Sequence, residues 1–141
     1  MFRKNISQTK TKGFTLVEIL VTVAVVTMLA ALAIPNLLRS MLNANEANAR
    51  ATLKTISNAC ETFAAASQGL YPTAMDVLTG IPPPYLSEDY TLATRHGYNF
   101  DCDTLQVSGY SCTATPLACN RTGNQTFTTT TGGVLIAVDC S

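Results

Sequence analysis

The sequence has few of the residues from which catalytic and metal sites are built. His96 is the only histidine among 141 residues. No Ser-His-Asp arrangement with a supporting motif and no glycine-rich phosphate loop is present. The cysteines also lack the CxxC-like pairs that are typical of zinc sites. We therefore expect neither an enzyme nor a bound cofactor, and we expect His96 to be a surface or strand residue.

Positive charge is scarce beyond the first residues. The chain has nine basic and nine acidic residues, but four of the basic residues fall within residues 1–13. The remainder holds five basic against nine acidic residues, a net charge of −4. An acidic surface offers no basic footprint for phosphate groups, so contact with nucleic acid is not predicted from charge.

Charge is also nearly absent from one long apolar run, residues 14–34. Its only residues that are not apolar are Thr15, Glu18, Thr22 and Thr27. A helix needs about 20 apolar residues to cross a bilayer, so this run is long enough to span. Because a basic cluster precedes it, we expect a cytoplasmic amino terminus and an exported remainder.

An ordinary secretory signal is one interpretation of this segment, with residues 31–33, Ala-Leu-Ala, as its cleavage site. The mature protein would then be a secreted, disulfide-rich binding domain. Glu18 opposes this interpretation, because an unpaired carboxylate in an apolar helix costs on the order of 3 kcal/mol on insertion scales. The helical pattern also continues past Pro35, where a cleaved signal would give way to an unrelated mature start.

Residues 12–18, Lys-Gly-Phe-Thr-Leu-Val-Glu, resemble the class III leader junction of type IV pilins and pseudopilins. The resemblance implies a cleaved leader, residues 1–13, removed by a prepilin peptidase that cuts between Gly13 and Phe14 and methylates Phe14. It also implies a membrane-spanning assembly helix, residues 14–38, and matches Pro35 to the proline that kinks this helix in the family.

Glu18 has a physical role in such a scheme. Cleavage would create an α-amino group at Phe14, and Glu18 is the only nearby anion. The two residues can pair within one chain, since positions i and i+4 share a helical face. The resemblance implies instead a pair between adjacent subunits that aligns each arriving copy. The plainer alternative is that Glu18 only extends toward the lipid headgroups.

Beyond Pro35, which should bend or locally melt the helix, a second amphipathic half is expected up to about Ser67. Its apolar stripe consists of Leu38, Leu42, Ala49, Leu53, Ile56, Cys60 and Phe63. Polar residues, Asn43, Glu46, Asn48, Arg50, Lys54 and Asn58, occupy much of the remaining surface. Asn45 interrupts the stripe, so contact with a partner surface should be strongest from Ala49 onward.

The rest of the chain predicts a small sheet. A loop is expected to about residue 89, containing a short helix, residues 74–79, and a stiff turn at residues 82–84. The expected strands are residues 90–92, 97–101, 104–110, 125–130 and 134–139. An antiparallel sheet over residues 90–141, laid against the apolar face of the helix, gives an α+β fold. The resemblance implies the same architecture, with residues 39–141 as the pilin globular domain.

Four of the five cysteines, Cys102, Cys112, Cys119 and Cys140, crowd into the last 40 residues, which indicates an oxidised, exported domain. Five cysteines allow fifteen ways of making two bridges. We prefer Cys102 with Cys112 and Cys119 with Cys140. Cys60 lies on the apolar helical face, where a buried free thiol is expected.

A calcium site is a weak candidate at four carboxylates. Asp101 and Asp103 have the alternating placement that puts two side chains on one side of a strand, and Glu88 or Asp89 would complete the ligand set. No compact acidic loop of the EF-hand type is present, so solvated surface carboxylates are favoured and no metal is predicted.

These observations predict a structural subunit of a type IV pilus. Its expected partners are copies of itself in a helical filament, the prepilin peptidase and methylase, and the membrane-bound assembly machinery. It would lie in the bacterial inner membrane before assembly and in an extracellular pilus afterwards. A pseudopilin of a type II secretion system, which would stay periplasmic, shares the same leader and helix and remains the alternative.

Overall fold

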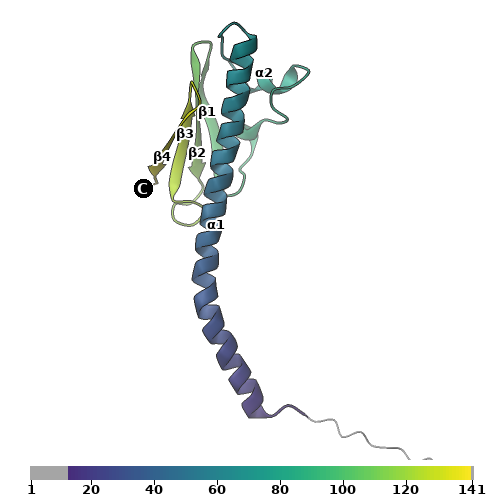
Figure 1. Cartoon of the computed structure of the whole chain (residues 1–141), viewed down its shortest axis with the longest axis vertical. Coiled ribbons are helices and arrows are strands. Elements are labelled where there is room, and N and C mark those ends of the chain that lie inside the picture. Colours follow the sequence, from purple (N-terminus) through teal and green to yellow (C-terminus); the bar gives the residue numbers. More distant parts are fainter. Residues whose placement is uncertain (1–12, 141) are drawn as a thin grey trace, which may run out of the picture. The chain divides into compact units, whose positions relative to one another are not determined.

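The computed structural model describes residues 13–140. Along the chain it contains α1 (Leu16–Ala66), α2 (Met75–Gly80), the 3₁₀ helix η1 (Tyr90–Leu92), and the strands β1 (Tyr98–Gln106), β2 (Gly109–Pro116), β3 (Gln125–Thr130) and β4 (Val134–Asp139) (Figure 1). The contacts divide the chain into two compact units, one ending at Leu37 and one beginning at Leu38.

In the first unit, α1 is an apolar helix whose side chains are almost all exposed. By length and composition it is able to cross a membrane. The hydroxyls of Thr22 and Thr27 donate to the carbonyls of Ile19 and Ala24 at 2.8 and 2.9 Å, so neither threonine presents an unsatisfied donor to an apolar environment. The helix continues through Pro35. The local melting that was one of the two effects expected of this proline does not occur.

In the second unit, α1 buries one stripe against the sheet. Ala49, Leu53, Ile56 and Cys60 are at most 1% exposed. The prediction that contact is strongest from Ala49 onward is therefore confirmed. Every step in this part of the stripe is three or four residues, which keeps the buried side chains on one helical face.

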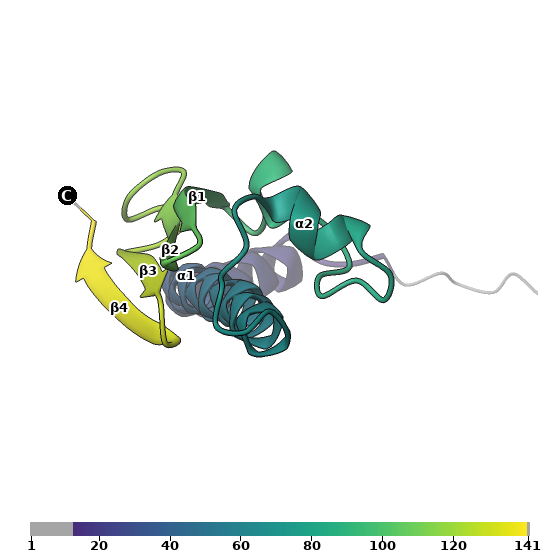
Figure 2. The same cartoon turned by 90° about the horizontal axis from the view of Figure 1, so that it is seen from above.

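The sheet is an antiparallel meander in the order β1-β2-β3-β4. Its core residues come from alternate positions of the first three strands: Tyr98, Phe100, Tyr110, Cys112, Ala114 and Phe127. All six residues of β4 are exposed. Viewed from above, β4 forms one end of the sheet and α2 lies on the opposite side of the unit (Figure 2). The α+β fold predicted from the sequence is confirmed.

Two of the expected strands, residues 125–130 and 134–139, have the bounds of β3 and β4. Two other strand predictions were wrong. Residues 90–92 form η1, because the Asp89 carboxylate accepts the Thr91 N–H at 2.8 Å and caps a helical turn. Residues 104–110 cross the turn between β1 and β2 at Val107 and Ser108, and the turn signal Ser108-Gly109 was overlooked in that prediction.

Candidate processing and assembly site

The amino-terminal end of α1 is held by a reciprocal pair of contacts between Thr15 and Glu18. The Glu18 N–H donates to Thr15 Oγ1 at 3.3 Å, and the Thr15 N–H lies 3.5 Å from Glu18 Oε2. This arrangement is a capping box, which satisfies amide groups that a helix start leaves without partners. We did not predict it, although the signal, a threonine followed three residues later by a glutamate, is present in the sequence.

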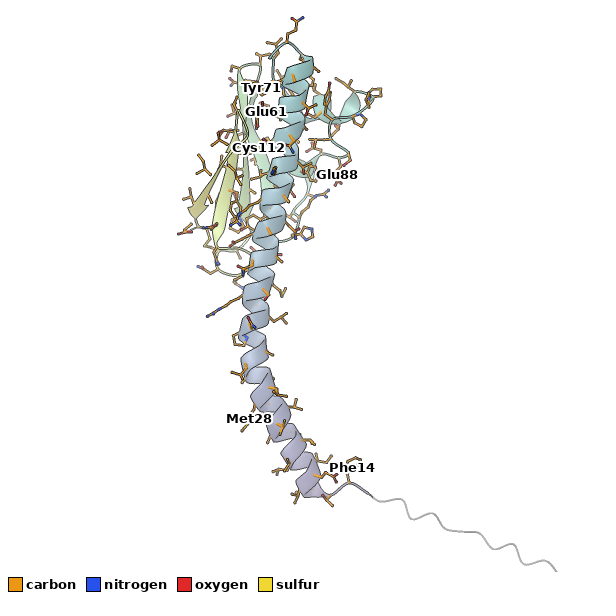
Figure 3. The ribbon with its side chains drawn as sticks, in the orientation of Figure 1. Phe14, Met28, Glu61, Tyr71, Glu88 and Cys112 are labelled. Atoms are coloured by element: carbon orange, nitrogen blue, oxygen red, sulfur yellow. A yellow bond between two sulfur atoms is a disulfide. The ribbon has the colours of Figure 1, made fainter. Side chains whose placement is uncertain are left out.

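The proposed cleavage junction lies immediately before this cap. Phe14 is 79% exposed, and Figure 3 shows it at the head of α1. Gly13, Phe14, Thr15 and Glu18 line one shallow, open hollow. The Glu18 carboxylate therefore lies beside the backbone position at which a cut after Gly13 would create a new amino group.

Large apolar side chains cover the helix that follows. Between Leu16 and Leu32, at least half of the surface of each Leu, Ile, Val and Met side chain named here is exposed: Leu16, Val17, Ile19, Leu20, Val21, Val23, Val25, Val26, Met28, Leu29 and Leu32. Soluble monomeric proteins rarely expose so much contiguous apolar surface. Exposed apolar surface of this extent marks a site of contact with lipid or with another protein.

Where α1 meets the sheet, Glu46 lies inside the contact, at 8% exposure. Its carboxylate accepts the Asn124 N–H at 2.8 Å and lies 3.6 Å from the Arg50 guanidinium. Placing Glu46 on the polar surface of the helix was therefore wrong. Its spacing from Ala49 and Leu53 puts it on the buried face, where the partners above satisfy its carboxylate.

A second carboxylate, Glu61, joins three separate segments. It accepts hydrogen bonds from Tyr71 Oη at 3.0 Å, Tyr110 Oη at 3.1 Å and the Gly132 N–H at 2.7 Å. Ser57 Oγ lies 2.8 Å from Tyr110 Oη. Burial, with the Glu61 charge adding to it, raises the pKa of Tyr110 to about 12. Glu61, which the sequence did not single out, thus fastens α1 to the loop after it and to the turn before β4.

Two disulfides, Cys102–Cys112 and Cys119–Cys140, cross-link segments of the sheet. They are the pairing that we preferred from the sequence. The first joins β1 to β2, and the second joins the end of β4 to the loop before β3. Cys60 is free and buried, as expected, and burial raises the pKa of its thiol to about 12.

The four calcium candidates are not brought together. Glu88 makes a two-point ion pair with Arg95 at 2.7 and 2.8 Å. Asp101 and Asp103 are both exposed, on either side of the half-buried Cys102, and a β-bulge shifts the register of β1 between Asp101 and Thr104. Within residues 13–140, no three His, Cys, Asp or Glu residues are arranged to hold a metal ion.

His96 was expected at the surface or in a strand, and it is exposed in the turn that precedes β1. Its backbone has a positive φ of 48°, a conformation that most residues adopt only in such turns.

Two comparisons relate the chain to known proteins. Residues 8–34 match the Prokaryotic N-terminal methylation motif, and residues 8–12 of that match lie outside the described residues. Over 54 residues the chain is 35% identical to the type IV major pilin protein PilA of Myxococcus xanthus (strain DK1622). The aligned segment covers 38% of this chain and 24% of that relative, so the chain matches about a quarter of its length.

Proposed function

We propose that this protein is a structural subunit of a type IV pilus. The proposal is supported by an N-terminal methylation motif at the head of an exposed apolar helix in a pilin-like α+β chain. A prepilin peptidase cuts between Gly13 and Phe14, and Phe14 becomes the N-methylated first residue. The chain then leaves the inner membrane by joining a helical filament of copies of itself.

The single observation that carries this proposal is the exposed apolar surface of α1 with one carboxylate at its start. In a bilayer, lipid covers the apolar side chains, but Glu18 costs on the order of 3 kcal/mol if it has no partner. In a filament, other copies of α1 replace the lipid. The amino group of Phe14 in a neighbouring copy supplies the missing cation for Glu18.

The capping box adds a step to this scheme. Thr15 and Glu18 both remain after the cut, so Glu18 can cap its own helix while the subunit waits in the membrane. Pairing with the Phe14 amino group of another copy needs only a change of the carboxylate's partner. Thr15 then continues to cap the helix through its hydroxyl, so helix and intersubunit pair are compatible.

The carboxyl-terminal part suits a location outside the cytoplasm. Its two disulfides form and persist in oxidising compartments. The basic residues that precede the apolar run favour a cytoplasmic amino terminus, which places the sheet on the exported side. The sheet would then face outward from a filament whose centre is formed by the apolar helices.

The test is mass spectrometry of the mature amino terminus together with electron microscopy of cells that lack the protein. We expect a chain that begins at N-methylated Phe14, and loss of surface filaments on deletion. A mature chain that begins at Ile34 would overturn the proposal in favour of an ordinary signal peptide. Intact filaments combined with a loss of protein secretion would overturn it in favour of a secretion pseudopilin.

A further inference from the structure

The free edge of the sheet, β4, is apolar along almost its whole length. Its sequence is Val-Leu-Ile-Ala-Val-Asp, and both of its faces are open: Val134, Leu135, Ile136 and Val138 are 42% to 62% exposed. A strand at the edge of a sheet presents N–H and C=O groups that another strand can pair with. Natural edge strands are normally protected by a charge, a proline or a bulge, and β4 has only Asp139, at its end.

The opposite edge of the same sheet, β1, has these protections. A β-bulge interrupts β1 between Asp101 and Thr104, and Asp101 and Asp103 place two carboxylates at this point. At its start, Tyr98 forms an isolated bridge with Arg95, and the strand also contacts η1. The two edges therefore differ, and only β4 is open to a further strand in the part of the chain that the structure describes.

The backbone direction of β4 defines which groups are available. Cys140 donates its N–H to the Asn124 carbonyl at 2.9 Å, and hydrogen-bonded pairs alternate along antiparallel strands. The backbone groups of the even-numbered residues of β4 are thus directed at β3. Those of Leu135, Ala137 and Asp139 are directed at the free edge.

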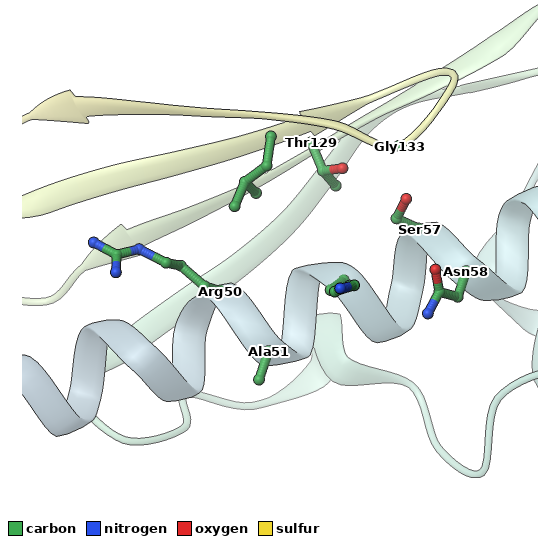
Figure 4. A pocket seen from close by; sticks show the side chains of 8 residues that line it. Arg50, Ala51, Ser57, Asn58, Thr129 and Gly133 are labelled. Carbon is green, nitrogen blue, oxygen red and sulfur yellow. The ribbon is translucent and has the colours of Figure 1, made fainter.

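A hollow of about 340 Å³ lies beside β4 on the side that faces α1. Arg50, Lys54 and Ser57 of α1 line it together with Gly133 and Leu135 (Figure 4). Arg50 already lies 3.6 Å from the Glu46 carboxylate. Lys54 makes no ion pair within residues 13–140, so the hollow carries a cation that is available to an incoming carboxylate.

We propose that β4 pairs antiparallel with β4 of a second copy, about a two-fold axis at Ile136. Leu135 then lies opposite Ala137 of the second copy, a large side chain against a small one, and Val134 lies opposite Val138. Asp139 falls opposite Gly133 of the second copy, which lines the hollow containing Lys54. The partner that fits this edge is therefore β4 of a second copy, which complements it in side-chain size and in charge.

Neighbouring registers fit less well. Residues directly opposite each other share a face of the sheet, so the two-fold axis must pass through a residue. The alternative registers therefore place the axis at a neighbouring residue. At Ala137 it would place the Asp139 carboxylate opposite the apolar Leu135. At Leu135 it would move Asp139 past Gly133 and leave Lys54 without its anion. Ile136 is the position that satisfies both the apolar and the charged side chains.

This contact differs in kind from filament assembly and does not depend on it. A two-fold contact uses the same surface on both copies and closes after two, so it cannot extend a helical polymer. If the chain forms filaments, paired β4 strands join copies that belong to different filaments. Without filaments, they join two free copies.

Disulfide cross-linking of variants that each carry one introduced cysteine beside the five native ones tests the register. In the proposed pair, the two copies of residue 136 form a non-hydrogen-bonded pair with Cα atoms about 4.5 Å apart, within the range of a disulfide. Two copies of residue 138 would lie about 14 Å apart along the strands at about 3.4 Å per residue. Ile136→Cys and Val138→Cys are matched, because both side chains are exposed on the same face of the same strand.

The full chain, purified in detergent and oxidised with copper phenanthroline, is run on a non-reducing gel. We expect Ile136→Cys to form dimers at least about tenfold faster than Val138→Cys, since only the first pair meets disulfide geometry. Equal rates would show random encounters in micelles and would overturn the proposal. So would no cross-link in either variant, the result expected if β4 binds a strand from another protein.

Charge reversal tests the proposed Asp139–Lys54 contact independently. In the Ile136→Cys background, Lys54→Glu should slow cross-linking, because it places a carboxylate opposite Asp139 of the second copy. Adding Asp139→Lys should restore the rate. Failure of the double change to restore it, with circular dichroism showing both variants folded, would overturn the register.

Discussion

Replacement of Glu18 by alanine should abolish filaments while leaving the cleavage step intact. In an assembled filament the Phe14 amino group would then be buried without a partner, and breaking a buried ion pair costs about 3 to 5 kcal/mol. Since about 1.4 kcal/mol is a factor of ten, the affinity of each arriving subunit should fall by a factor of about 100 to several thousand. Filament yield, measured by shearing and electron microscopy, reports this loss.

Two matched variants separate the charge of Glu18 from its capping role. Thr15→Ala removes the hydroxyl that accepts the Glu18 N–H at 3.3 Å but keeps the carboxylate, and loss of a cap costs about 0.5 to 2 kcal/mol. Glu18→Gln keeps the shape of the side chain and removes its charge. We expect Glu18→Gln to resemble Glu18→Ala, and Thr15→Ala to retain filaments. Normal filament yield in Glu18→Ala, or equal losses in Glu18→Ala and Thr15→Ala, would refute the ion-pair argument.

Three further predictions concern the globular unit, measured by reversible unfolding of the purified chain. Leu53→Ala should lower the free energy of unfolding by about 2 to 5 kcal/mol, because Leu53 is fully buried, whereas Leu117→Ala, at a side chain that is 59% exposed, should change it little. Glu61→Gln should lower the unfolding free energy by about 1 to 3 kcal/mol through loss of charge-assisted hydrogen bonds, and an unchanged value would contradict the contacts of Glu61. Burial raises the pKa of Cys60 from 9.0 to about 12, so its contribution to stability is present below pH 9 and is lost as the pH rises toward 12; Cys60→Ala should flatten that decline, and an unaltered pH profile would show that the thiol is not its source.

The sequence predicted the structural features that follow from regular spacing of apolar residues. The stripe from Ala49 to Cys60 is strictly spaced at three and four residues, so the buried face of α1 followed directly from it. The strands at residues 125–130 and 134–139 are bounded by glycine or polar turn residues, which made their ends visible. The disulfide pairing agreed with our preference among fifteen alternatives.

The features that the sequence did not predict depend on contacts between distant segments. Glu46 reads as a polar surface residue until Asn124, 78 positions along the chain, supplies its hydrogen bond. The three partners of Glu61 likewise come from separate parts of the sequence. The bulge in β1 leaves no mark in composition. Local sequence patterns do not show which distant group donates a hydrogen bond to a given carboxylate.

The disulfide Cys119–Cys140 has a mechanical consequence for the sheet. It closes a covalent loop across 21 positions and fixes the end of β4 to the segment before β3. Under tension applied along the chain, an edge strand normally detaches first by peeling, one hydrogen bond at a time. Here the bridge holds one end of β4, and the short turn from Thr130 holds the other. Tension therefore passes from Cys140 through the disulfide to Cys119 and bypasses β3 and β4, so β4 cannot be peeled from the sheet while the bridge is intact.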